Sequence, residues 1–238
     1  MKPQGAEHKT LSRRLVDRYG RQLRAPFNNF VQRYSLIGQQ PVFDPKEFDY
    51  LRRLEARWEE IRAEADAVMA GDRVPSLSSI SPDHQELDNQ GKWRTYFLWG
   101  YGIKVPRQCE RCPTTAALVE KIPGLLTAMF SIHEPGAHLP RHRGVTKGML
   151  TYHLGLHVPD NCHINVEDTD YRWREGEFFV FDDTCYHETF NHSDRDRVIL
   201  LLHVRRPLRA PGSWVQELFF WGIRRSPFVQ DVKKALNV

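Results

Sequence analysis

From residue 126 to residue 205 the sequence is a succession of short apolar runs, which limits the fold more than any other feature. The runs are rich in β-branched and aromatic residues, and Gly, Pro, Asn or Asp separates each from the next. Many short strands without intervening helices favour a sandwich or a closed double sheet over alternating β-α units. The expected strands are residues 94–100, 126–134, 149–158, 163–167, 171–174, 177–181 and 197–205.

The segment before these strands has a helical pattern. Asp44 followed by Pro45 is typical of a helix start, and apolar residues then recur every three or four positions to about Ala70. We expect one helix over 44–70, a loop over 71–91, and short helices at 113–121 and 226–238. The predicted fold is mainly β with N-terminal helices. Within one domain overall, residues 1–90 form a basic arm and helical support region, and residues 91–238 form the β core with a short C-terminal helix.

Charge is unevenly distributed along the 238 residues. Residues 1–40 carry eight Lys and Arg against two acids, and residues 201–238 carry seven against two. Basic ends favour anionic partners, and an anionic membrane surface is the candidate here, since no nucleic-acid motif accompanies the charge. No apolar run reaches the ~18 residues of a spanning helix, and no secretory signal is visible. We expect a cytoplasmic protein, peripheral to the membrane at most, and leave the oligomeric state open.

The cysteines give little guidance. Four Cys in a chain of this length are not a disulfide framework. Cys109 and Cys112 form one CxxC, but a structural zinc site would need a second ligand pair of similar spacing. We interpret the cysteines as reduced thiols, and the role of this pair stays open.

Histidines concentrate in the predicted β region. Two of them stand where strands are expected to end: His142 lies in a turn-rich segment, and His187 follows the predicted strand of residues 177–181. Two imidazoles at strand ends of a double sheet can converge on one metal ion, and imidazole suits Fe, Zn, Cu or Ni. His142 and His187 are therefore candidate metal ligands.

The order of motifs around these histidines resembles the aspartyl/asparaginyl β-hydroxylase family, over about residues 93–207. The resemblance implies a double-stranded β-helix, that is, a jelly-roll or cupin-like core. It also implies an iron(II)- and 2-oxoglutarate-dependent dioxygenase that uses O2 to hydroxylate an unactivated C–H bond. The motifs are His142-Arg143-Gly144, Tyr152-His153-Leu154-Gly155-Leu156, Gly176-Glu177, Phe181-Asp182-Asp183-Thr184, His187-Glu188 and Arg197-Val198-Ile199-Leu200.

The resemblance implies that His142 and His187 are the catalytic iron ligands. Position 144 is Gly where most enzymes of this chemistry carry a third, carboxylate ligand, so water would fill that place. His138 and Glu188 stay open as alternative third ligands.

The resemblance also implies three contacts to 2-oxoglutarate, from Ser131, His153 and Arg197. An Arg that opens an apolar strand and points inward would neutralise the distal carboxylate of the cosubstrate. Thr151 departs from the family pattern, which often has Arg at this position.

The substrate is the open part of the prediction. An Asp- or Asn-type residue in a peptide or small molecule is the first expectation. An acyl chain of a membrane lipid is the alternative: the basic ends favour it, whereas Gly144 opposes it because an acid is expected there in the lipid branch. A non-catalytic jelly-roll binding module is the second alternative, but it has no need for His142, His187 and Arg197 together.

Three further features have two interpretations each. Asp182 and Asp183 either accept a hydrogen bond from a ligating imidazole or cap a turn at the end of a strand. Trp93 is expected in the core or the pocket wall. The run Phe219-Phe220-Trp221 either caps the barrel or forms an interface.

Overall fold

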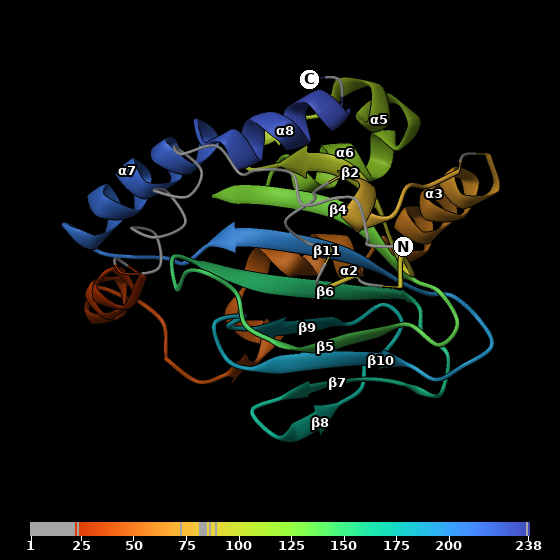
Figure 1. The fold of residues 1–238 in the computed structure, drawn as a ribbon, viewed down its shortest axis with the longest axis horizontal. Helices are drawn as coiled ribbons and strands as arrows, with labels where there is room; N and C mark the ends of the chain where they lie inside the picture. The colour runs from red at the N-terminus through yellow and green to blue at the C-terminus, as the bar shows by residue number, and fades with distance from the viewer. Residues whose placement is uncertain are drawn as a thin grey trace, which may run out of the picture.

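Two antiparallel sheets form the body of the protein in the computed structural model, which describes residues 22, 24–71, 73–80, 85, 87–88, 90–236 and 238. The larger sheet has the order β1-β9-β6-β11-β4-β2-β3 and the smaller one β5-β10-β7-β8, and both are visible in Figure 1. The strands are β1 (Val42–Phe43), β2 (Trp93–Gly100), β3 (Ile103–Lys104), β4 (Leu125–His133), β5 (His138–His142), β6 (Met149–His157), β7 (Cys162–Val166), β8 (Thr169–Tyr171), β9 (Phe178–Phe181), β10 (His187–Asn191) and β11 (Arg197–Arg205). This architecture confirms the expected jelly-roll core.

Helices surround the larger sheet (Figure 1). The expected helix over 44–70 is wrong as a single element, because Phe48 leaves helical geometry, with φ −123° and ψ 79°, and its ring is buried against Phe43 and Tyr152. The helices are residues 24–33, the 3-10 turns Pro45–Glu47 and Asp49–Leu51, α2 (Arg52–Glu55), α3 (Trp58–Gly71), α4 (Leu77–Ile80), α5 (Pro106–Arg111), α6 (Pro113–Val119), α7 (Gly212–Arg224) and α8 (Pro227–Leu236). None of the described helices has the length and apolarity that a bilayer crossing needs.

The structure also contains elements that the sequence patterns did not predict. Strands β5 and β10 are short and polar, and β5 contains a proline, so neither has the apolar alternation that predicts a strand. Helix α4 lies inside the expected loop, and α7 precedes the expected C-terminal helix. Most of the predicted basic N-terminal arm, residues 1–21 and 23, lies outside the described residues.

Alternation along the strands gives the larger sheet two different buried faces. Its outer face is apolar and packs against residues of α3 and α6 such as Ile61, Val68 and Val119. The outer face consists of Ala128, Phe130, Ile132, Leu150, Tyr152, Leu154, Leu156, Val198, Leu200, Leu202 and Val204. The inner face carries Thr127, Met129, Ser131, His133, Thr151, His153, Arg197, Ile199, Leu201 and His203.

The CxxC pair belongs to the outer core. Cys109 and Cys112 are buried, and the Cys109 thiol donates to the carbonyl oxygen of Leu98. Burial raises the pKa of both thiols, that of Cys112 to about 12. At neutral pH these groups are therefore protonated, packed thiols, in line with the interpretation from sequence.

Candidate active site

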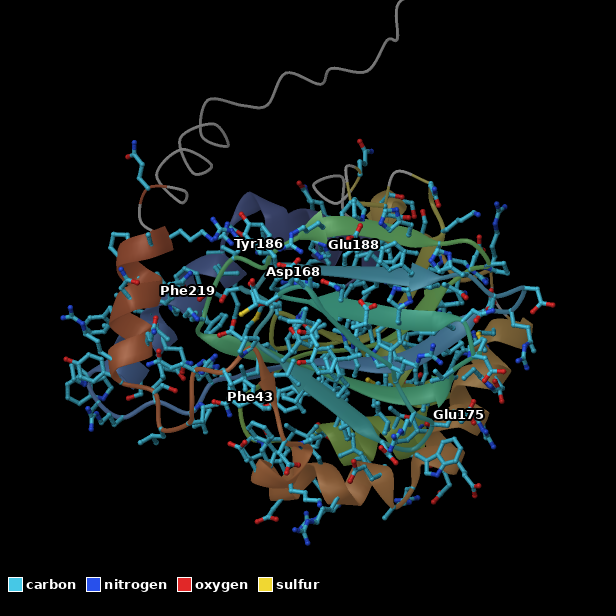
Figure 2. All side chains as sticks on the ribbon, turned by 90° about the horizontal axis from the view of Figure 1, so that it is seen from below. Phe43, Asp168, Glu175, Tyr186, Glu188 and Phe219 are labelled. Carbon is cyan, nitrogen blue, oxygen red and sulfur yellow. The ribbon has the colours of Figure 1, made fainter. Side chains whose placement is uncertain are left out.

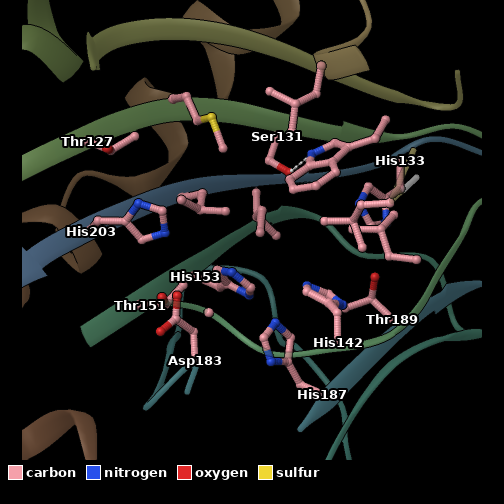
Figure 3. Close-up of a pocket in the computed structure, with 18 of the residues that line it drawn as sticks. Thr127, Ser131, His133, His142, Thr151, His153, Asp183, His187, Thr189 and His203 are labelled. Carbon is pink, nitrogen blue, oxygen red and sulfur yellow. Dashed lines mark hydrogen bonds between the residues drawn. The ribbon is translucent and has the colours of Figure 1, made fainter. Parts of the chain in front are cut away.

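A cavity of about 530 Å³ lies between the two sheets. Its volume falls within the roughly 300–1,000 Å³ of small-molecule sites. Polar residues from five strands converge in it, as Figure 3 shows. They are Ser131 and His133 of β4, His142 of β5, Thr151 and His153 of β6, His187 and Thr189 of β10, and Arg197 and His203 of β11, with Asp183 following β9.

The cavity brings the two predicted metal ligands together. His142 ends β5, His187 begins β10, and the two residues are direct partners across these strands, with ring centroids 4.1 Å apart. The Nδ1–H of His142 donates to Pro140 O at 2.8 Å, and that of His187 donates to Cys185 O at 3.0 Å. These bonds fix the tautomer and leave both Nε2 lone pairs for a metal.

Both imidazoles are held in the neutral form that metal binding requires. Burial lowers the pKa of His142, and burial together with His142 lowers the pKa of His187 to about 4. Among the described residues, no cluster of three or more His, Cys, Asp and Glu could hold a metal ion. The neutral His142 and His187 rings could coordinate one metal ion through their Nε2 atoms.

The two alternative third ligands lie elsewhere. His138 Nε2 and Glu188 Oε1 are 2.6 Å apart and form a pair of their own, and His138 is also stacked on Phe190. Neither residue lines the cavity. Their partners in the structure are thus each other rather than the histidine pair.

Asp183 occupies the space that a side chain at position 144 would need. A Cβ built on Gly144 would lie 2.3 Å from the carboxyl carbon of Asp183, and the Gly144 N–H donates to the Asp183 carbonyl oxygen. The Asp183 carboxyl is buried beside Thr151 (Figure 3). Within the part of the chain that the structure describes, its Oδ1 has no geometric hydrogen-bond partner. Burial, then the neighbouring Asp182, raises the pKa of Asp183 to about 7.

The two neighbouring aspartates therefore have different roles. Asp182 accepts from the backbone N–H and the hydroxyl of Thr184 and pairs with Arg206 at 2.6 Å, so it caps the turn after β9. Asp183 instead faces the cavity. Asp182 thus matches the turn interpretation, and of the two only Asp183 is placed to act on groups in the site.

Arg197 is a buried cation that has no acidic partner among the described residues. It is 1 % exposed, its guanidinium lies 4.6 Å from the Trp173 ring centroid, and its Nε and Nη1 have no hydrogen-bond partner. Burial lowers the pKa of Arg197 to about 9. Because a buried unpaired charge is costly, this arrangement is suited to binding an anion in the cavity.

Two tryptophans orient the other predicted cosubstrate contacts. Trp173 Nε1 donates to His153 Nδ1 at 3.1 Å, which leaves the His153 proton on Nε2. Trp93 Nε1 donates to Ser131 Oγ at 2.9 Å, so the Ser131 hydroxyl can itself donate. Burial, then the Arg197 charge, lowers the pKa of His153 well below its usual value, so its ring is neutral.

His133 is a cavity residue that the sequence analysis did not single out. It pairs with Arg197 across β4 and β11, is fully buried, and its Nδ1 has no hydrogen-bond partner. The signal was available in the strand pattern. The resemblance makes Ser131 a cosubstrate contact, and a residue two positions further along a strand faces the same way.

One end of the cavity is apolar. It is formed by the inner faces of β2, β4 and β11 and by residues of α4 and α8. This apolar lobe consists of Leu77, Ile80, Leu87, Trp93, Phe97, Tyr101, Met129, Leu139, Ile199, Leu201 and Val232. At the rim, Arg141 and Arg143 both lie about 5 Å from the Tyr186 ring centroid, and Val145 is exposed.

Fold and site together define a cupin-like jelly-roll protein with a two-histidine centre beside a buried, unpaired arginine. The chain belongs to the Aspartyl/Asparaginyl beta-hydroxylase family, whose model matches residues 55–207. It is therefore a member of a hydroxylase family, which confirms the resemblance found in the sequence.

Curated relatives support this assignment. The chain is 39 % identical over 207 residues to the ornithine lipid ester-linked acyl 2-hydroxylase of Rhizobium tropici, covering 84 % of this chain and 72 % of that protein. It is 33 % identical over 181 residues to human aspartyl/asparaginyl beta-hydroxylase, covering 72 % of this chain but only 23 % of the human protein. Among solved structures, the cupin domain of Schizosaccharomyces pombe Cnp3 matches with a TM-score of 0.34 and 13 % identity, covering 48 % of this chain and 65 % of that one.

Proposed function

We propose that this protein is an iron(II)- and 2-oxoglutarate-dependent hydroxylase that acts on the acyl chain of a lipid. The observation that carries the choice of substrate is the apolar lobe, which is continuous with the histidine pair in one cavity. The Rhizobium tropici relative, by its name, hydroxylates an ester-linked acyl chain, and it aligns with most of both proteins.

The residues present fit the two groups that this function requires. His142 and His187 would hold the metal through Nε2, since their Nδ1 atoms are already engaged. Arg197 would bind the distal carboxylate of 2-oxoglutarate in a charge-assisted pair. Iron(II) with 2-oxoglutarate and O2 supplies the oxidising chemistry, while the chain binds, orients and excludes water.

The cavity also gives the substrate a direction. The apolar lobe can bury a hydrocarbon chain. At the rim, the exposed Arg143, and Arg141 that pairs with Asp168 at 2.9 Å, could contact a polar or anionic head group. The carbon nearest the ester would then lie beside the histidine pair, between rim and lobe. Thr151 agrees with this substrate, because an acyl chain brings no second carboxylate that would need the missing Arg.

An Asp- or Asn-type substrate, the first expectation from the sequence, is the second candidate. The human relative is named for this activity, and the rim arginines could bind a carboxylate. The lobe argues against it, because a short polar side chain would contact little of this apolar lining. A non-catalytic binding module is disfavoured, since it has no use for two neutral imidazoles with matched free Nε2 atoms.

Product analysis separates these candidates. The protein is incubated with iron(II), ascorbate and 2-oxoglutarate, and with either a detergent-dispersed bacterial lipid extract or Asp- and Asn-containing peptides. We expect mass spectrometry to find one added oxygen atom on lipid acyl chains, with equimolar succinate, and none with His187→Ala. Oxygen added to the peptides alone would overturn the lipid proposal. If no substrate led to coupled succinate formation, the proposed enzymatic activity itself would be overturned.

A substitution in the lobe tests the acyl site directly. Ile199→Trp would fill the lobe from β11, and we expect it to lower acyl-chain turnover by about 10-fold or more without weakening metal binding. Val198→Ile is the matched control, because the neighbouring residue faces the outer core. Equal acyl turnover in both variants would show that the hydrocarbon binds elsewhere.

A further inference from the structure

Helix α7 presents a stripe of large apolar side chains to solvent. Trp214 is 71 % exposed, Leu218 67 % and Trp221 54 %. Residues spaced by four and three positions lie on one side of a helix, and Arg225 continues the same line at the helix end. The Arg225 guanidinium lies 3.9 Å from the Trp221 ring centroid. The α7 stripe is thus an aromatic and aliphatic surface that ends in a cation.

The opposite side of α7 packs against the body of the protein. The exposed stripe is therefore not the side by which the helix attaches to the core. Gln216 Nε2 donates to the carbonyl oxygens of Gly148 and Arg206, at 2.7 and 2.9 Å. Phe220 is buried, and Phe219 stacks on Phe27 of the helix over residues 24–33, with centroids 4.2 Å apart. Figure 2 shows Phe219 beside this helix. Of the run Phe219-Phe220-Trp221, two rings pack inward and the third faces out.

The same contacts connect α7 to the entrance of the cavity. Gly148, which α7 binds, ends the loop whose residues 144 and 145 line the cavity. Asn28 of the helix over residues 24–33 donates to Val145 O and accepts from Lys147 N–H. Val145 is itself 59 % exposed. Because Gly148 contacts the side of α7 opposite the stripe, the stripe lies one helix diameter, ~10–12 Å, from this part of the rim.

The C-terminal segment that contains the stripe is basic, which favours an anionic surface. Residues 201–238 carry seven Lys and Arg against Glu217 and Asp231, and Glu217 is paired with Arg205. Trp, Leu and Arg on one exposed helix face are typical of helices that lie at a membrane–water interface. A stripe of three side chains on one helix is also narrow for a stable protein interface, which buries roughly 1,200–2,000 Å².

We propose that α7 docks the protein on an anionic lipid bilayer, with Trp214, Leu218 and Trp221 inserted at the level of the head groups. This inference rests on the proposed lipid substrate, since it places the cavity rim at the surface where acyl chains are found. Docking makes the protein a peripheral membrane protein that draws its substrate from the bilayer.

The test measures vesicle binding and activity separately. Wild type, a variant carrying Trp214→Ser, Leu218→Ser and Trp221→Ser, and a control carrying Trp214→Phe and Trp221→Phe are sedimented with vesicles of equal parts phosphatidylglycerol and phosphatidylcholine, and with phosphatidylcholine alone. We expect wild type and the Phe control to bind the anionic vesicles, and the Ser variant to bind about 100-fold more weakly. Circular dichroism checks that all three are folded, as exposed positions should allow.

Activity then separates the two proposals. With the lipid presented in detergent, the Ser variant should hydroxylate as fast as wild type, and only its activity on vesicles should fall. Vesicle binding that is equal in wild type and the Ser variant overturns the docking role, even if acyl chains are hydroxylated. Docking without any acyl product overturns the proposed function instead. Light scattering that finds wild-type dimers without lipid, and monomers of the Ser variant, would assign the stripe to a second copy and overturn membrane docking.

Discussion

The outer and inner faces of the larger sheet are built by the same three central strands and are both buried, but their side chains meet different surroundings. On the outer face the side chains are apolar, and the Tyr152 hydroxyl is hydrogen-bonded to that of Tyr50 at 2.8 Å. On the inner face, Arg197 and His133 each have at least one buried polar atom without a hydrogen-bond partner among the described residues. Such atoms cost about 1–3 kcal/mol each. The outer face therefore mainly stabilises the fold, whereas the inner face keeps buried polar groups that a ligand could satisfy.

The largest effect is expected from removing a metal ligand on the smaller sheet that closes the inner face. We expect His142→Ala or His187→Ala to lower metal affinity by at least about 1,000-fold and to abolish turnover, because a two-ligand centre cannot lose one. Anaerobic titration with Co(II), followed by absorption, measures this. His138→Ala, on the solvent side of the same strand pair, is the matched control and should bind metal as wild type does.

Replacing the inner-face cation should separate ligand binding from stability. We expect Arg197→Met to weaken apparent 2-oxoglutarate binding by about 2–5 kcal/mol, roughly 30- to 5,000-fold, with little change in metal affinity. Without ligands, the free energy of unfolding should not fall, because the substitution removes an unpaired buried charge. Calorimetry and urea denaturation test both parts, and unchanged 2-oxoglutarate binding would contradict the role of Arg197.

Neighbouring leucines on opposite faces of β11 test the comparison within one strand. Leu200→Ala, in the outer core, should lower the free energy of unfolding by about 2–5 kcal/mol. Leu201→Ala should cost less, because Leu201 already borders a cavity and its removal only enlarges that space. Urea denaturation of the two variants provides the measurement. Equal losses would show that the inner face is packed as tightly as the outer one.

The pH dependence of stability should come from the inner face and is the smallest of these effects. Burial, then the Arg197 charge, lowers the pKa of His133 well below 6.5, so below pH 6.5 the unfolded chain takes up a proton that the folded chain does not. The contribution of His133 to the free energy of unfolding is therefore fully present above pH 6.5 and is lost as the pH falls below that value. Between pH 7 and pH 5 the free energy of unfolding should fall by about 1–2 kcal/mol less in His133→Leu than in wild type.

Asp183 should oppose this trend. Its folded pKa of about 7 lies above the unfolded value of 3.8, so folding is favoured by protonation as pH falls from 7 toward 4. An Asp183→Asn variant should therefore become less stable relative to wild type as pH falls through this range, opposite in sign to His133→Leu. Urea denaturation at pH 7 and pH 5 distinguishes the two.

The sequence was sufficient to predict those strands whose pattern of residues is local. The strands from β4 to β11 that build the larger sheet were expected within about two residues, because their apolar runs and flanking Gly, Asn and Asp are visible in sequence. His142 and His187 were candidate metal ligands from their expected places at strand ends, and the family resemblance implied their role. Strands β5 and β10 were missed because their pairing depends on tertiary partners rather than on apolar alternation, although they carry both histidines.

Other features could not be derived from sequence patterns. The contact between the Gly144 backbone and the Asp183 carboxyl joins distant residues whose approach is decided by the turn after β9. The helix pattern over 44–70 was correct for α3 but concealed the break at Phe48, where burial of one ring outweighs helix continuation. The direction of α7 likewise depends on Gln216 reaching two carbonyl groups of other segments.

The register that places His142 opposite His187 has a consequence for the whole chain. One ion bound by both residues is a cross-link between positions 142 and 187, and it closes a loop of about 45 residues that would otherwise add to the entropy of the unfolded state. A metal ion at the proposed site would therefore also be a reversible cross-link between two strands of the smaller sheet. Iron supply would then determine how often β5 and β10 separate, in addition to whether the protein can react.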